Sequence, residues 1–172
     1  MALTLRACTH ADLDALVNIS KETFTAAFEK DNDPKDFQDY LQKAFRPDKM
    51  ASELNDANSL FYFIFEGKEL VGYFKLNLNE SQTDIKDPRA VEIERIYVLE
   101  SHQGKQIGAW MLQEIIRMGK KLGKTFIWLG VWERNPKAIR FYQRHGFEKF
   151  ADHPYYIGTD KQTDWLLRLD LQ

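Results

Sequence analysis

Residues 91–109 read VEIERIYVLESHQGKQIGA, and no other stretch of the chain is as informative. The first eight residues predict a strand, the next four a short polar turn, and QGKQIGA the opening of an amphipathic helix. The first turn of a helix has backbone N–H groups without intrahelical partners, and its dipole favours an anion. Gly104 and Gly108 would let the backbone approach a bulky diphosphate closely. The stretch therefore predicts a binding site for a phosphate-bearing cofactor.

The bulk composition fits one globular domain over residues 1–172, long enough to bury a proper core. The net charge is −2, so no basic surplus points to nucleic acid or membrane lipid as a partner. Cys8 is the single cysteine, which excludes an intrachain disulfide and is consistent with a reducing compartment. No signal peptide and no membrane-spanning apolar segment is apparent, so we expect a cytoplasmic protein.

Periodicity and turn residues divide the chain into alternating elements. A helix is expected to start near residue 11 and to break at 31–34, and a second helical region to run over 35–54, interrupted at Arg46-Pro47. Residues 79–89 are expected to form a loop. Strands are predicted over 3–7, 60–65, 69–78, 91–99, 125–131, 147–156 and 163–171, and further helices over 104–122 and 135–145. This order predicts an α/β or α+β domain with a mixed sheet, in which 91–131 forms a parallel crossover.

Two common phosphate-binding motifs do not match the predicted phosphate-binding stretch. A P-loop requires Gly-x-x-x-x-Gly-Lys-Ser/Thr, which residues 104–109 lack. A dinucleotide fold requires Gly-x-Gly-x-x-Gly near an early strand, whereas these glycines stand four apart and late in the chain.

The pattern that fits is Gln/Arg-x-x-Gly-x-Gly/Ala after a strand ending in Ile-Tyr-Val. With it, the chain resembles the GNAT superfamily of acetyl-CoA-dependent N-acetyltransferases. A second GNAT block follows at residues 131–147, VWERNPKAIRFYQRHGF, with the spacing Asn-x-x-Ala-x-x-Phe-Tyr-x-x-x-Gly-Phe. The resemblance implies a mostly antiparallel mixed sheet of six to seven strands flanked by four or five helices. It also implies a splayed parallel strand pair at the cofactor site.

The chain departs from the family at Gln106, where GNAT proteins usually have glycine. We expect the Gln106 side chain to point away from the diphosphate, with its N–H retained. Within the superfamily, residues 23–24, 34–41, 53–54 and 93–98 look like the PaiA-like spermine/spermidine acetyltransferase branch.

The resemblance assigns the cofactor contacts residue by residue. Backbone groups of Ile96, Tyr97 and Val98 would meet the pantetheine arm and the acetyl carbonyl, at a bulge that splays this strand from the next. Asn135 would bind the pantetheine arm or the adenosine end, or simply cap the helix that begins at Pro136. The diphosphate would be wrapped by Gln103, Gly104, Lys105, Gln106, Ile107, Gly108 and Ala109, while Lys137 and Arg144 either meet the ribose phosphate or stay solvated.

Acetyl transfer to an amine requires loss of a proton from the amine and a proton for the departing thiolate. The resemblance makes Tyr142 the general acid, although a Phe-Tyr pair on a helix is also typical of a core. Glu92 and Glu94 lie two apart on one strand face, and either could serve as base, directly or through water. Glu92 fits the family position best, and the alternative for both is an ion pair with Arg95 or Arg89.

The acceptor pocket is expected between the first two helices and the late loops. Glu29, Asp31 and Asp33 would attract a polyamine there, and Tyr155 could line the pocket. The leading function is therefore transfer of an acetyl group from acetyl-CoA to a small-molecule primary amine, with a polyamine such as spermidine or spermine favoured, by direct attack in a ternary complex. Alternatives are a protein N-terminal or aminoglycoside acetyltransferase and a CoA-binding sensor without catalysis. No metal ligand set is expected, and the chain could be a monomer or a homodimer.

Overall fold

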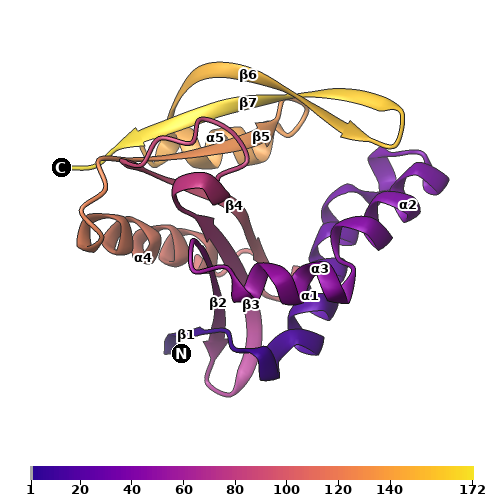
Figure 1. Cartoon of the computed structure of the whole chain (residues 1–172), viewed down its shortest axis with the longest axis horizontal. Helices are drawn as coiled ribbons and strands as arrows, with labels where there is room; N and C mark the ends of the chain where they lie inside the picture. Colours follow the sequence, from indigo (N-terminus) through magenta and orange to yellow (C-terminus); the bar gives the residue numbers. More distant parts are fainter. Residues whose placement is uncertain (1) are drawn as a thin grey trace.

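The computed structural model describes residues 2–172, whose seven strands form one sheet in the order β1-β2-β3-β4-β5-β7-β6 (Figure 1). Neighbouring strands are antiparallel except β4 and β5, which are parallel. The predicted mixed, mostly antiparallel sheet is therefore confirmed. The strands are β1 (Leu3–Ala7), β2 (Ser59–Glu66), β3 (Glu69–Asn77), β4 (Ala90–Val98), β5 (Phe126–Trp132), β6 (Glu148–Ile157) and β7 (Asp160–Asp170).

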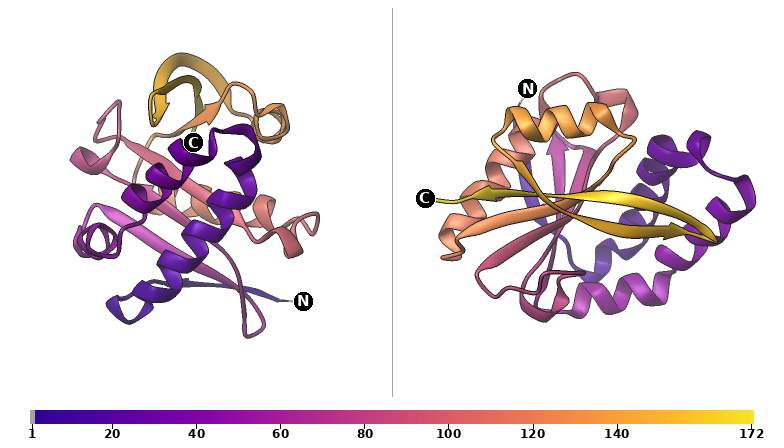
Figure 2. Two further views of the ribbon diagram at one scale, coloured as in Figure 1. Left: turned by 90° about the vertical axis from the view of Figure 1, so that its right-hand side faces the viewer. Right: turned by 90° about the horizontal axis from the view of Figure 1, so that it is seen from above.

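Five α-helices flank the sheet within residues 2–172, in agreement with the expected four or five. Three of them cover one face, and the other two cover the opposite face (Figures 1 and 2). The first group packs against Phe61, Phe63 and Tyr73, and the second against Ile127 and Leu129. The first group is α1 (Leu13–Phe28), α2 (Pro34–Ala44) and α3 (Pro47–Asn55), and the second is α4 (Ile107–Lys121) and α5 (Pro136–Arg144).

Proline sets the starts of three helices. Pro34, Pro47 and Pro136 each occupy the first turn, where the missing N–H costs no hydrogen bond. Arg46 before Pro47 has an extended backbone, with ψ of 132°, so the predicted interruption between α2 and α3 is confirmed.

The parallel pair β4 and β5 separates after three residues. Only Ala90–Glu92 pairs with Phe126–Trp128, and the two strands diverge beyond that point. The splayed pair is therefore confirmed, but the bulge lies elsewhere than expected. The β3–β4 register shifts between the pairs Lys75–Arg95 and Leu76–Ile93, which places the extra residue at Glu94 rather than at 96–98.

Helix α4 begins later than the prediction of residue 104. Gly104 and Gln106 have φ of +82° and +64°, in the left-handed region, and such residues cannot continue a right-handed helix. Residues 103–106 therefore form a loop that follows the 3₁₀ turn Glu100–His102, and the first helical residue is Ile107.

The β6–β7 hairpin crosses the end of the sheet and reaches α2 (Figures 1 and 2). The hydroxyls of Tyr40 on α2 and Tyr155 on β6 form a hydrogen bond of 2.5 Å. Gln162 on β7 donates from Nε2 to Asn32 Oδ1 at 2.8 Å. The hairpin is therefore attached to the α1–α2 region rather than standing free.

Candidate active site

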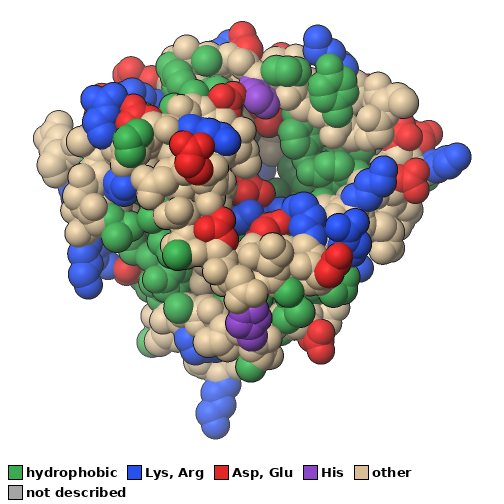
Figure 3. Space-filling view, in the orientation of Figure 1, with side chains coloured by type: hydrophobic (Ala, Val, Ile, Leu, Met, Phe, Trp, Pro, Cys, Tyr) green, Lys and Arg blue, Asp and Glu red, His purple; other side chains and the backbone are tan. Residues whose placement is uncertain are grey.

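A cavity of about 920 Å³ opens where β4 and β5 separate. Helices on opposite faces of the sheet line its two ends, so it passes through the split sheet. We call these the α4–α5 end and the α1 end. The α4–α5 end is lined by residues of 103–109 other than Lys105 and by one side of 135–144, and the α1 end by residues of 23–31 other than Thr25 and Glu29, with Tyr155, Gln162 and Asp164. The molecule is hollowed between the β6–β7 hairpin and α1, with hydrophobic side chains gathered along one wall (Figure 3).

The loop before α4 presents a row of free backbone donors. The N–H groups of Gly104–Ala109 make no hydrogen bond within residues 2–172, and Trp110 N is the first to bond an acceptor, Gln106 O, at 3.1 Å. A Cβ at Gly104 would meet nothing within 4 Å, so the loop borders open space. Free N–H groups at a helix start are the geometry that binds a diphosphate. The residues present therefore fit the expected phosphate-bearing group.

Gln106 occupies a position that favours glycine. Its φ of 64° and ψ of 16° place it in the left-handed region, which costs a residue with a Cβ about 1–2 kcal/mol. The backbone requirement explains why glycine is usual here. The N–H of Gln106 stays free of partners within the described residues, as expected.

Several cations surround the α4–α5 end. Lys137 and Arg144, both predicted cofactor contacts, line the cavity, and so does Arg134. Lys105 does not line it, and its Nζ lies 4.0 Å from Glu66 Oε1. The positive charge available to an anion therefore comes mainly from α5 and the turn before it.

Ile96, Tyr97 and Val98 line the cavity between its two ends. They pair with β3 at Phe74, Tyr73 and Gly72, whereas β5 has already diverged. Alternate backbone groups of a strand point to opposite sides, so half of those on this segment face the gap. An extended pantetheine arm could pair with them as a strand would.

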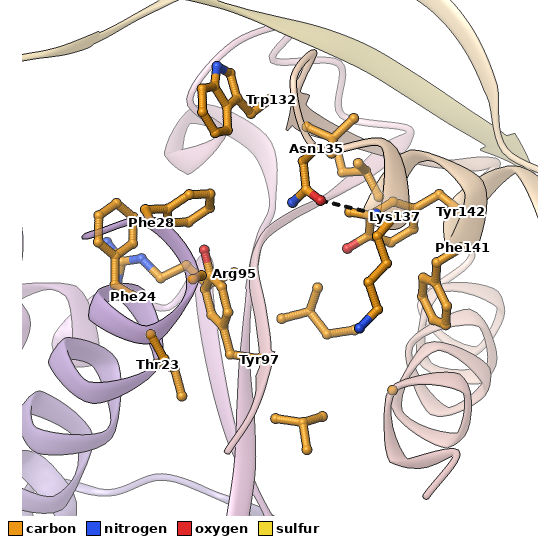
Figure 4. A pocket seen from close by; sticks show the side chains of 18 of the residues that line it. Thr23, Phe24, Phe28, Arg95, Tyr97, Trp132, Asn135, Lys137, Phe141 and Tyr142 are labelled. Carbon is orange, nitrogen blue, oxygen red and sulfur yellow. Dashed lines mark hydrogen bonds between the residues drawn. The ribbon is translucent and has the colours of Figure 1, made fainter. Parts of the chain in front are cut away.

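Tyr142 on α5 lines the cavity (Figure 4), and its hydroxyl makes no hydrogen bond within residues 2–172. Burial raises the pKa of Tyr142 above its ordinary value. The hydroxyl therefore stays protonated at neutral pH and can donate. The sequence left open whether Tyr142 is a core residue or a catalytic one. In the structure it lines the cavity and its ring also packs edge-on against Phe147.

Asn135 also combines both of its predicted roles. Its Oδ1 accepts a hydrogen bond from Ala138 N at 3.2 Å, which caps α5. The residue also lines the cavity and faces it in the close view (Figure 4). Its Nδ2 group makes no hydrogen bond within residues 2–172 and can reach a ligand.

Glu92 lies outside the cavity and is fully engaged. Its Oε1 accepts from Thr83 N at 2.7 Å and from Asn77 Nδ2 at 3.0 Å, and its Oε2 accepts from Thr83 Oγ1 at 2.5 Å. Burial raises the pKa of Glu92, and these hydrogen bonds oppose the rise. Glu92 is therefore not placed to reach an amine in the cavity, although it fits the family position best.

Glu94 lines the cavity within a buried ion cluster. Lys75 Nζ lies 2.8 Å from Glu94 Oε1 and 2.7 Å from Glu53 Oε1, and Arg95 lies 3.1 Å from Glu94 Oε2. Burial alone would raise the pKa of Glu94, but the charges of Arg95 and Lys75 outweigh it and hold that pKa at about 2. Glu94 stays ionised but is a weak proton acceptor. The predicted ion pair with Arg95 is present, whereas Arg89 pairs with Asp87.

The predicted acceptor residues are divided by the fold. Asp31 and Tyr155 line the α1 end, whereas Glu29 and Asp33 do not. Asp33 instead accepts from Asp36 N at 3.0 Å and caps α2, because Pro34 opens that helix. The acidic cluster is therefore partly a helix cap and only partly a cavity wall.

Aromatic rings form much of the α1 end. Phe24 and Phe28 come from α1, and Phe28 meets Trp132 of β5 edge-on at 6.4 Å (Figure 4). Tyr155 of β6 lies across from them on the hairpin. Ring faces beside a carboxylate favour an organic cation.

No helix within residues 2–172 is both long and apolar enough to span a membrane. Over the same residues, no group of three or more His, Cys, Asp or Glu side chains is arranged to hold a metal ion.

Comparison with known proteins agrees with this geometry. The family model described as acetyltransferase (GNAT) family matches residues 13–147. The chain belongs to the GNAT acetyltransferase family. It is 39% identical over 157 residues, 91% of each chain, to an uncharacterized N-acetyltransferase in the pepI 3′ region of Lactobacillus delbrueckii subsp. lactis.

Two further proteins are similar to this chain. The spermine/spermidine N(1)-acetyltransferase of Bacillus subtilis is 37% identical over 102 residues, 55% of this chain and 66% of the relative. The crystal structure of the PaiA N-acetyltransferase from Thermoplasma acidophilum in complex with coenzyme A superimposes with a TM-score of 0.79. It covers 99% of both chains at 19% identity, which shows the shared fold.

As a GNAT protein, the chain is an acetyl-CoA-dependent N-acetyltransferase. The split between β4 and β5, the donor row before α4 and the cavity between them fit this acetyl donor.

Several cavity residues were missed at the sequence level. Trp132, Phe24 and Phe28 line the α1 end, and so does Asp164, which stands opposite Trp132 in the β5–β7 register. That pairing joins positions 32 residues apart, and a single sequence does not reveal strand register. The only local signal at Asp164 is an acidic residue beside the apolar run Trp165-Leu166-Leu167.

Proposed function

We propose that this GNAT protein acetylates a primary amine of a small cationic molecule, with a polyamine such as spermidine or spermine as the favoured acceptor. The observation that carries the proposal is the α1 end of the cavity. Aromatic rings and the carboxyl groups of Asp31 and Asp164 line it together. Carboxylates attract an ammonium group, and ring faces stabilise it by cation–π contact. The Bacillus relative named above supports the same acceptor class.

The shape of the α1 end favours a small molecule over a peptide. The β6–β7 hairpin is fastened to α2 by the Tyr40–Tyr155 hydrogen bond, and its Gln162 reaches Asn32 before α2. A peptide acceptor requires an open groove, whereas these contacts close one side of the cavity. The protein N-terminal and aminoglycoside alternatives are therefore the second and third acceptor classes to test.

The proposed cofactor contacts follow the geometry. Residues 104–109 donate backbone N–H groups to the diphosphate, Gln103 precedes them on the cavity wall, and Ile96–Val98 pair with the pantetheine arm. Asn135, Lys137 and Arg144 complete the site from α5. The amine attacks the thioester directly while both substrates are bound. The position of Tyr142 at the cavity argues against a sensor that binds CoA without catalysis, because such a sensor needs the row of N–H groups but no proton donor.

The acceptor is tested by thiol release from acetyl-CoA against spermidine, spermine, diamines, aminoglycosides and N-terminal peptides. Saturable activity confined to polyamines and diamines is the expected result. Turnover of peptides or aminoglycosides alone would mean that one of these, and not a polyamine, is the acceptor. Measurable CoA binding with no turnover of any amine would favour the sensor.

Tyr142 is proposed to protonate the departing thiolate. Tyr142→Phe removes only the hydroxyl, which has no partner within residues 2–172, so the fold and CoA binding should be retained. Loss of a general acid lowers turnover about 10²-fold or more. Steady-state kinetics with calorimetric CoA binding checks this, and unchanged turnover would remove Tyr142 from the acid role. Ile139→Val, a buried position of the same helix outside the cavity, is the packing control.

A further inference from the structure

Asp164 occupies a distinctive place on the wall of the α1 end. It lies on β7 opposite Trp132 of β5, past the point where β4 and β5 separate. The neighbouring wall residue on β5 is Gly130, and a Cβ there would lie 3.2 Å from Asp164 Oδ2. The carboxyl group therefore lies over bare backbone beside the cavity.

The Asp164 carboxyl has no hydrogen bond and no ion pair within residues 2–172. It is nevertheless only partly exposed. Buried carboxylates are normally paired or hydrogen-bonded, because removing a charge from water is costly. A partly buried carboxylate without a partner, on a cavity wall, is available to a ligand.

The other acidic groups near the cavity are less suited to take a proton. Glu94 is paired with Lys75 and Arg95, and Glu92 lies outside the cavity with three hydrogen bonds. Asp31 lines the cavity but is exposed to solvent.

We propose that Asp164 accepts the proton that the acceptor ammonium group loses before it attacks acetyl-CoA. The inference rests on the amine N-acetyltransferase function above, and it holds for whichever amine is the acceptor. The ammonium nitrogen carries three protons, and the amide product keeps one. One proton passes to the Asp164 carboxylate and then to solvent. As the N–C bond forms and the C–S bond breaks, Tyr142 gives its hydroxyl proton to the departing thiolate. The second proton lost from the nitrogen restores the Tyr142 hydroxyl, so the products are the amide, the CoA thiol and one proton in solvent.

The surroundings of Asp164 favour this task. Burial raises the pKa of Asp164 to about 6, and the charge of His153 on β6 opposes the rise. Tyr155 of β6 and Tyr40 of α2 also face it, and Lys30 and Asp31 lie at the same end of the cavity. His153 is itself paired with Asp84 at 2.7 Å. A base with a pKa near the working pH is the most effective proton acceptor.

The test compares Asp164→Asn with wild type in pH profiles of kcat/KM. For wild type, kcat/KM should rise with pH through about 6, because the carboxylate must be ionised to act. Asp164→Asn should lose this limb and about 10²-fold in kcat near neutral pH. A weakly basic amine of the same size should rescue most of that loss, because it reaches the site already neutral. An unchanged profile, or a raised KM with kcat intact, would overturn the proposal.

Asp170→Asn is the matched control, because Asp170 lies on the same strand outside the cavity and pairs with Arg168. Should Asp164→Asn fold poorly, Gly130→Ala supplies the second variant. Its methyl group would displace the carboxyl without removing it, and should lower kcat in the same way.

A titration separates this proposal from the choice of acceptor. Carbon-13 spectra of protein labelled at the Asp carboxyl, with CoA bound, should show one resonance that titrates well above the ordinary aspartate range and disappears in Asp164→Asn. If Asp164 titrates in the ordinary range, it is not the proton acceptor. If no amine of the panel is acetylated, the acceptor proposal fails, whereas this measurement still decides the role of Asp164.

Discussion

Gln106 adopts a left-handed backbone conformation that is unfavourable for a residue with a Cβ. Its left-handed φ costs about 1–2 kcal/mol for a residue with a Cβ, and glycine relieves most of this at some cost in unfolded-state entropy. We therefore expect Gln106→Gly to raise the free energy of unfolding by up to about 1 kcal/mol. CoA should bind at least as tightly, because the N–H is kept.

The matched control for Gln106→Gly is Lys105→Gly, one residue earlier. Lys105 is not among the residues with positive φ, so glycine there gains nothing and should cost roughly 0.5 kcal/mol. Urea unfolding with calorimetric CoA binding measures both variants. A Gln106→Gly protein less stable than wild type would mean that the side chain makes a stabilising contact that outweighs the backbone strain.

Glu92 is expected to tie the loop before β4 to the sheet rather than to take a proton. Glutamine can make the same three hydrogen bonds. Its Oε1 still accepts from Thr83 N and Asn77 Nδ2, and its Nε2 donates to Thr83 Oγ1, which at present donates to Glu92 Oε2. Because the raised pKa of Glu92 means that its charge is costly when folded, Glu92→Gln should be no less stable than wild type at pH 7. Turnover should stay within about twofold, since a base removed from a site costs far more. A large loss of kcat with normal stability would restore Glu92 as a candidate base.

At the scale of elements, α3 is held to the sheet by the ion cluster of Glu53, Lys75, Glu94 and Arg95. The pKa values of Glu53 and Glu94 are both lowered, since the charges of Lys75 and Arg95 outweigh the effect of burial. A lowered carboxyl pKa contributes stability that is complete above the ordinary value near 4.5 and is lost as the pH falls toward 2. The free energy of unfolding should therefore decline steeply over that range.

Lys75→Met tests the cluster directly. The change leaves two partly buried carboxylates with one fewer cation, which should cost about 2–3 kcal/mol at pH 7, less than for a fully buried pair. The loss should shrink at pH 4, because those carboxylates then protonate more readily. Asp48→Asn, in the exposed pair with Arg46 at the start of α3, should leave the unfolding midpoint nearly unchanged. Equal losses for Lys75→Met at both pH values would show that packing, not charge, holds α3.

The sequence predicts the helices and strands better than it predicts the strand register and the cavity between the elements. The strand at 91–98, the break at Arg46-Pro47 and the cap at Asn135 follow from local signals, and the structure confirms them. The predicted start of α4 is wrong, because nothing in the neighbouring sequence indicates that Gln106 adopts a left-handed conformation. The position of the bulge and the place of Asp164 depend on strand register, which joins residues far apart in the chain.

At the scale of the whole molecule, the β6–β7 hairpin closes the α1 end by lying on α2. Gly158, at the hairpin turn, has φ of +61°, and a Cβ there would lie 2.5 Å from Asp36 Cγ. Gly158→Ala should therefore both strain the turn and lift the hairpin from α2. We expect KM for the amine to rise severalfold while the Kd of CoA stays unchanged, because the diphosphate site lies at the other end of the cavity.

Gly67→Ala separates the two effects. Gly67 has the same φ of +61° in the β2–β3 turn, but a Cβ there would meet nothing within 4 Å. Both variants should lose about 1 kcal/mol of stability from backbone strain, as thermal unfolding would show. Only Gly158→Ala should raise KM for the amine. If both variants keep the wild-type KM, the contact between the hairpin and α2 does not shape the acceptor end, and Tyr155 and Asp164 are held in place by the sheet alone.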